Sequence, residues 1–236
     1  MEAKRPRLDP SLGSVGRDSR SPATSREDTN SHEEPFPSAQ SLRGEDTVAM
    51  EEAVTKIRKM LISKNGAKRF LSEEGLLVAL VELLHKATAN VTSPLCKWSS
   101  LLRGIVSSLA NVCNFSLIAC LELKRSHMRF IPVATRLLES GIRTCSSTKA
   151  SVLRLIGNMC QHKESAHFVT SNSSLVDKVS LMMEDDADCI RTNAFRVIRL
   201  LVDKHFVKGI KAMNRGGNQQ RGSVSVVRRV QNGDDY

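Results

Sequence analysis

Asparagine and arginine side chains recur three and four residues apart in several segments of the chain. Residues with this spacing lie on one face of a helix. Three such stripes are Arg103, Ser107, Asn111 and Asn114; Ser151, Arg154, Asn158 and Gln161; and Asn193, Arg196, Arg199 or Leu200, and Asp203. A carboxamide both donates and accepts hydrogen bonds, and a guanidinium forks onto a carboxylate or phosphate. These residue types are suited to binding polar and anionic groups.

Catalytic signatures are missing from the sequence. It has no G-x-x-x-x-G-K-[ST] phosphate loop, no G-x-G-x-x-G, no G-x-S-x-G and no H-E-x-x-H. Cys160, His162 and His167 are close in sequence, but they lack a fourth ligand and fit no familiar zinc spacing. We therefore expect no enzyme activity, no metal and no cofactor. The six scattered cysteines are expected to be reduced, and most of them buried.

Positive charge is concentrated in the middle and C-terminal parts of the chain. Residues 1–47 hold seven basic and nine acidic residues, a net charge of −2, whereas residues 48–203 carry +7 and residues 204–236 carry +5. Such an excess attracts acidic partners or nucleic acid. No window approaches the apolar length of a membrane span, and no signal-peptide core begins the sequence. A soluble chain made in the cytosol, without a membrane partner, is expected.

Composition divides the chain into three regions. Residues 1–47 are rich in Ser, Pro and charged residues, and they cannot bury enough apolar surface to order themselves, so a disordered tail is predicted. Residues 48–211 show apolar residues three and four apart, which predicts a helical domain. Residues 212–236 are predicted to be a flexible basic tail. The expected helices are 48–63, 67–73, 76–88, 98–113, 116–125, 129–140, 147–161, 164–170, 174–183 and 187–203.

An internal repeat runs through the helical domain. Leu109-Ala110-Asn111-Val112-Cys113 aligns with Ile156-Gly157-Asn158-Met159-Cys160 at an offset of 47, and Ile198-Arg199-Leu200-Leu201-Val202 follows after a further 42. Helix lengths cycle from short to medium to long. Periods of about 40–47 residues are typical of armadillo and HEAT arrays.

The repeating segments resemble armadillo repeats. Gly75-Leu76-Leu77 opens a segment similar to the second helix of such a repeat, and Leu109-Ala110-Asn111-Val112 resembles the family's L-x-N-L third helix. The resemblance implies an all-α fold, a short right-handed armadillo-like superhelix of about three repeats flanked by disordered tails. Arg199 and Leu200 stand where a small residue and Asn are expected, which leaves a HEAT-like variant open. A non-repeating helical bundle is the other alternative.

The resemblance also implies a concave groove lined by the third helices. Asn111 and Asn158, which match the family's asparagine, would hold an extended peptide. Arginines would then select acidic or phosphorylated residues. The candidate groove residues are Arg103, Ser107, Asn111, Lys149, Arg154, Asn158, Arg191, Arg196 and Arg199. The alternative is an ordinary solvated face in which the asparagines bond neighbouring helices.

Both tails carry short motifs. Lys4, Arg5, Pro6 and Arg7 resemble a nuclear import signal that an importin-type receptor binds, which predicts a nuclear protein, with a cytoplasmic pool also allowed. Arg215-Gly216-Gly217 and Arg221-Gly222 are similar to RNA-binding RGG segments. Two hypotheses follow: a non-enzymatic nuclear scaffold or adaptor for an acidic or phosphorylated protein segment, or an RNA- or DNA-binding protein.

Overall fold

Short helices separated by tight turns make up the structure, a computed structural model that describes residues 34–139 and 144–203. No strand occurs in these ranges. The elements are α1 (Ala39–Arg43), α2 (Thr47–Met60), α3 (Lys64–Ser72), α4 (Leu76–Asn90), α5 (Lys97–Phe115), α6 (Leu117–Lys124), η1 (Ser126–Met128), α7 (Phe130–Leu137), α8 (Ser146–Met159), α9 (Lys163–Thr170), α10 (Ser173–Leu181), η2 (Met182–Glu184) and α11 (Asp188–Asp203). Every predicted helical range overlaps an observed α-helix.

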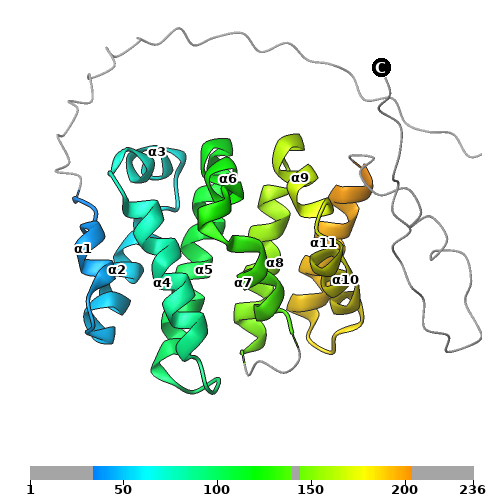
Figure 1. Ribbon diagram of the computed structural model, residues 1–236, viewed down its shortest axis with the longest axis horizontal. Helices are drawn as coiled ribbons and strands as arrows, with labels where there is room; N and C mark the ends of the chain where they lie inside the picture. The colour runs from blue at the N-terminus through cyan, green and yellow to red at the C-terminus, as the bar shows by residue number, and fades with distance from the viewer. Residues whose placement is uncertain (1–33, 140–143, 204–236) are drawn as a thin grey trace, which may run out of the picture. The chain divides into compact units, whose positions relative to one another are not determined.

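The helices follow one another in three-helix units (Figure 1). The units are α3–α5, α6–α8 and α9–α11, and α1 and α2 form a leading pair. The short helices α3, α6 and α9 lie along one edge, at the top of the view in Figure 1. The long third helices pack in series, α2 on α5, α5 on α8 and α8 on α11, and these are the most extensive helix contacts. The chain thus has the predicted armadillo-like arrangement.

Local chemistry explains where the helices begin. Side chains of Ser63, Ser116 and Asn172 accept hydrogen bonds from backbone N–H groups in the first turns of α3, α6 and α10. Helix α4 instead starts after Gly75, whose φ of 71° lies in the left-handed region that glycine adopts without strain. Local capping residues thus define where α3, α4, α6 and α10 begin.

The core is continuous through all units. Leucines, valines and isoleucines on the inner faces of the second and third helices are buried in one cluster. Close approach of α2 to α5 requires a small residue, because a Cβ at Gly104 would lie 2.9 Å from Val54 Cγ1. Cys113, Cys120 and Cys160 are buried, while Cys96 and Cys145 are half-buried and Cys189 is exposed.

The predicted start of the domain at Val48 is wrong. Phe36 and Leu42 are buried at 8% and 1% exposure, and α1 packs against α4 and α2. The Phe36 ring also meets Phe70 edge-on at 5.7 Å between centroids. Residues 35–46 therefore belong to the packed domain and supply the missing second helix of the leading unit. Residues 204–236, including the predicted trailing segment to residue 211, lie outside the described residues.

Leu42→Ala tests this boundary. Because Leu42 is fully buried, truncation should lower the free energy of unfolding by about 2–5 kcal/mol, measured by urea denaturation. Leu95→Ala is the matched control, since Leu95 is 97% exposed and should show no measurable change. Equal stabilities of the two variants would mean that α1 is not packed.

Candidate functional site

A pocket of about 350 Å³ lies across the carboxyl ends of α2 and α5 and the facing sides of α8 and α11. One wall of the pocket is apolar, and the other lining side chains carry amide or guanidinium groups. Its lining residues are Leu61, Ile62, Asn111, Asn114, Phe115, Arg154, Asn158 and Arg196. Residues of the leading pair and of all three units therefore contribute to one site.

Asn158 joins three third helices through its side chain. Its Nδ2 donates to the Ala110 carbonyl of α5 at 2.7 Å, and its Oδ1 accepts from Arg196 Nη2 of α11 at 2.8 Å. Gln161 Nε2 donates to the same oxygen at 3.3 Å. Only 3% of Asn158 is exposed. Asn158 thus bonds neighbouring helices and holds Arg196 in place.

Arg154 repeats this arrangement one unit earlier. Its Nη2 donates to Asn111 Oδ1 at 3.3 Å and to the Ser107 carbonyl at 3.5 Å, both on α5. Its Nε is buried and has no hydrogen-bond partner. In both cases an arginine of one third helix contacts the asparagine of the preceding third helix.

Positive charge in the pocket has no carboxylate partner. Within the described part of the chain, neither Arg154 nor Arg196 forms an ion pair. Burial, and secondarily the neighbouring charge of Arg196, lowers the pKa of Arg154, which nevertheless stays protonated because arginine titrates so far above neutral pH. Carbonyls at the ends of α2 and α5 carry partial negative charge that favours nearby cations. Among the described residues, none pairs with Arg154 Nε. The two arginines give the pocket the positive charge needed to accept an anion.

The prediction that Asn158 holds a peptide backbone is wrong. Burial and its three hydrogen bonds occupy all but one of the donor and acceptor positions of its carboxamide. The alternative, that the asparagines bond neighbouring helices, describes Asn158 correctly. Asn111 is half-buried, and Asn114, one turn further, is exposed. These two are the carboxamides that a ligand can reach.

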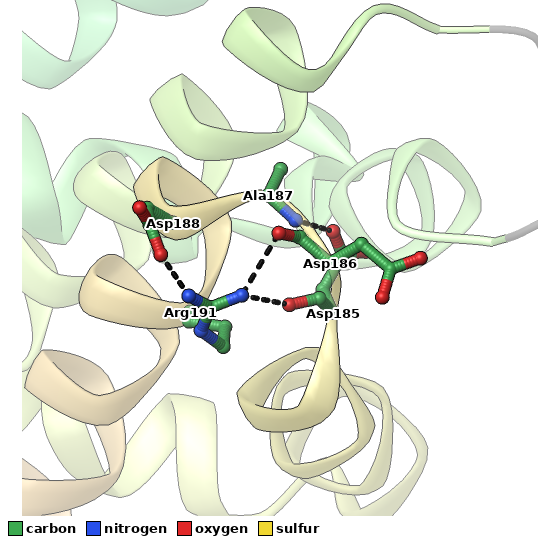
Figure 2. A network of polar contacts seen from close by, with 5 residues as sticks. All are labelled: Asp185, Asp186, Ala187, Asp188 and Arg191. Carbon is green, nitrogen blue, oxygen red and sulfur yellow. Dashed lines mark hydrogen bonds and ion pairs between the residues drawn. The ribbon is translucent and has the colours of Figure 1, made fainter.

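Arg191 also lies elsewhere than predicted (Figure 2). Its Nη1 donates to the carbonyls of Asp185 and Asp186, each at 2.8 Å, and its Nη2 pairs with Asp188. The Asp185 carboxylate in turn accepts from the Ala187 N–H at 2.9 Å. Arg191 therefore closes the turn that leads into α11, and its guanidinium is not free for a partner in the groove.

The remaining predicted residues do not line the pocket. Ser107 Oγ lies 3.3 Å from Ser151 Oγ, between α5 and α8. Arg103 and Arg199 are exposed, and Lys149 is half-buried. None of these three side chains forms an ion pair with a described residue. Arg103 and Arg199 share the faces of Ser107 and Arg196 by helical spacing, so they extend the positive charge beside the pocket.

The apolar wall was missed in the sequence. Ile62 is 76% exposed although it is large and apolar. In the structure, Ser100 donates a hydrogen bond to Glu51 and so joins α5 to α2 at an offset of 49 residues. At this offset Ile62 takes the position that is equivalent to Asn111. Extending the repeat into the leading helix would have found it.

Other site types find no support in the described ranges. They hold no group of three or more His, Cys, Asp or Glu side chains that could bind a metal. None of their helices is both long enough and apolar enough to cross a membrane. The predicted import signal Lys4, Arg5, Pro6 and Arg7 lies outside the described residues, as do both RGG-like segments.

Structural comparison identifies the fold as armadillo-like. No known family profile and no curated protein sequence matches the chain. Among solved structures, it is similar to the designed armadillo repeat protein YIII(Dq)4CqI, with a TM-score of 0.57 and 14% identity over 69% of this chain and 62% of the design. The chain thus spans less than two thirds of that design's length.

Two further structures give the same result. The designed armadillo repeat protein YIII(Dq.V1)4CPAF in complex with peptide (KR)4 matches with a TM-score of 0.56 and 14% identity, over 70% of this chain and 68% of the design. An engineered protein matches with a TM-score of 0.55 and 17% identity, over 71% and 66%. At these identities the likeness shows an armadillo-like helical repeat fold and nothing finer.

Asn158→Ala should destabilise the domain more than Asn111→Ala. Removing the buried carboxamide leaves the Ala110 carbonyl and Arg196 without their partner, a loss of about 1–3 kcal/mol in urea denaturation. Asn111 is half-buried and makes one hydrogen bond of 3.3 Å, so its loss should cost clearly less. Equal losses, or a larger loss for Asn111, would contradict the linking role of Asn158.

Proposed function

We propose that this protein is a non-enzymatic scaffold that binds an acidic or phosphorylated segment of a partner protein in its cationic groove. One observation carries the proposal: Arg154 and Arg196 line a single pocket without any carboxylate partner in the described chain. Guanidinium groups bind carboxylate and phosphate by charge-assisted forked hydrogen bonds. An anionic partner segment would supply the missing acceptors.

The shape of the fold supports a peptide as ligand. Its third helices stack in series, and side chains from α2, α5, α8 and α11 share the pocket. One of the similar designs is a complex with the peptide (KR)4, which is basic. The pocket of this protein carries uncompensated positive charge, so it favours a negatively charged segment instead of a basic one. Asn111 and Asn114 are the carboxamides available to bond its backbone.

Nuclear localisation is part of the proposal. The run Lys4-Arg5-Pro6-Arg7 is short and basic, which suits an importin-type receptor. The partner would then be a nuclear protein, and the chain would act as an adaptor there.

Charge reversal at the pocket should abolish partner capture. In affinity purification from nuclease-treated nuclear extract, Arg154→Glu/Arg196→Glu should reduce recovery of acidic or phosphorylated proteins at least about tenfold, because the variant repels the ligand it should bind. Lys68→Glu/Arg136→Glu is the matched control: it changes net charge equally, at exposed positions on α3 and α7 that lie outside the pocket. The control should capture partners as the unchanged protein does.

Nuclease treatment separates this function from nucleic-acid binding. A protein partner should survive nuclease and moderate salt, whereas RNA or DNA binding weakens steeply as counterions compete for phosphates. Loss of every partner after nuclease would overturn the scaffold proposal in favour of a nucleic-acid-binding protein.

Localisation is tested at the N-terminal basic run. A fluorescent fusion of the full chain should accumulate in the nucleus, and Lys4→Ala/Arg5→Ala/Arg7→Ala should shift it to the cytoplasm, because the receptor binds the basic side chains. Nuclear accumulation of the triple variant, measured by quantitative microscopy, would remove this run as the import signal.

A further inference from the structure

We propose that the Arg154/Arg196 pocket receives one phosphorylated side chain, a phosphomonoester dianion, in preference to the carboxylate of Asp or Glu. This inference rests on the proposed function and names the chemical group that the groove selects. Both arginines line the same pocket and are close enough for the charge of Arg196 to act on Arg154.

Charge matching favours phosphate over carboxylate. Two guanidinium groups bring two full positive charges to the pocket, and no described carboxylate offsets them. A phosphate monoester carries a charge of about −1.5 to −2 near neutral pH, whereas a carboxylate carries only one negative charge. One phosphoryl group can therefore neutralise both arginines, and one carboxylate leaves an excess positive charge in a half-buried site.

The number of free donors leads to the same conclusion. Each guanidinium has five N–H groups, and among contacts between described residues only Nη2 of Arg154 and Nη2 of Arg196 donate. Within the described residues, Arg154 Nε also has no hydrogen-bond partner. A phosphoryl group offers three acceptor oxygens, enough to bond both arginines at once.

The rest of the pocket fits the side chain that carries the phosphate. Exposed Ile62 and partly buried Phe115 form an apolar wall in the same pocket as the arginines, while Leu61 is fully buried there. Methylene or ring carbons of a phosphorylated residue can pack there and exclude water, which strengthens the ionic hydrogen bonds. A volume of about 350 Å³ is at the small end for ligand pockets and suits one side chain of a longer segment.

Asn111 and Asn158 act as positioning residues for this site. Each accepts a hydrogen bond from one arginine and so restricts where the guanidinium lies. A guanidinium whose orientation is already restricted loses less rotamer entropy on binding than a free lysine or arginine side chain. The planar fork, and not charge alone, is therefore the feature that recognises phosphate.

Labelled peptides that differ at one position test the inference with the full chain. The probes are acidic twelve-residue pools whose fixed central residue is phosphoserine, phosphotyrosine, glutamate or serine, measured by fluorescence anisotropy at pH 7.5. We expect at least one phosphorylated pool to bind about tenfold or more tightly than the glutamate pool. The comparison of phosphoserine with phosphotyrosine identifies which side chain the apolar wall prefers.

Charge-conserving variants assign the effect to the pocket. Arg154→Lys/Arg196→Lys keeps both positive charges but removes the forks. The advantage of the phosphorylated pool over the glutamate pool should therefore fall clearly, and only the part due to charge should remain. Arg43→Lys/Arg136→Lys is the matched control at exposed positions outside both the pocket and the predicted groove, and it should keep that advantage. Circular dichroism melting of both variants shows whether they stay folded.

Lowering the pH offers a readout that needs no variant. The second proton of a phosphate monoester binds with a pKa of about 6. Only arginines titrate in the pocket lining, and they stay charged. Lowering the pH from 7.5 to 5.5 should therefore convert the phosphate toward its monoanion and weaken the binding of the phosphorylated pools. Binding of the glutamate pool should stay nearly unchanged.

The possible outcomes separate the two proposals. If the acidic pools bind and the phosphorylated pools bind no better, the phosphate preference is wrong and the scaffold proposal stands. An advantage that is undiminished in Arg154→Lys/Arg196→Lys also overturns the pocket assignment. If no pool binds at all, both proposals fail together.

Discussion

The hydrogen bonds between successive third helices determine how the groove is built. Asn158 of α8 donates to the Ala110 carbonyl of α5 and accepts from Arg196 of α11. A single buried carboxamide therefore sets the register of three helices and fixes the head of an arginine. Asn111 accepts the equivalent bond from Arg154 one unit earlier. The same hydrogen bonds therefore join the stacked repeats and position the arginines.

This arrangement concentrates positive charge where the fold provides few acceptors. The arginines are held by amide and carbonyl oxygens, and Arg154 Nε is left without a partner. A buried unpaired donor is costly, and pairing it recovers that cost. An anionic ligand matches this positive charge, whereas asparagine contacts with a peptide backbone would leave it unbalanced.

Periodicity allowed the helices and the repeat offset to be predicted, because burial of apolar faces dictates both. It could not reveal α1, since five residues among Ser, Pro and charged neighbours carry no helical period, and only contact with α4 and α2 orders them. Spacing placed Arg154, Arg196 and Asn111 on the correct faces. Spacing could not predict that Asn158 is buried, because its partner on α5 is distant in sequence. Nor could it predict that Arg191 closes a turn, because the backbone carbonyls that it contacts lie outside the helix and follow no helical spacing.

Nitrogen-15 NMR of the arginine side chains tests the central claim most directly. Inorganic phosphate is titrated into the full chain at pH 7.5, with chloride used to hold the ionic strength constant. We expect the Nε–H resonances of Arg154 and Arg196 to shift together, with one saturation curve, while those of exposed Arg43 and Arg136 do not move. Unchanged Arg154 and Arg196 resonances, or equal small shifts at all arginines, would contradict an anion pocket between these helices.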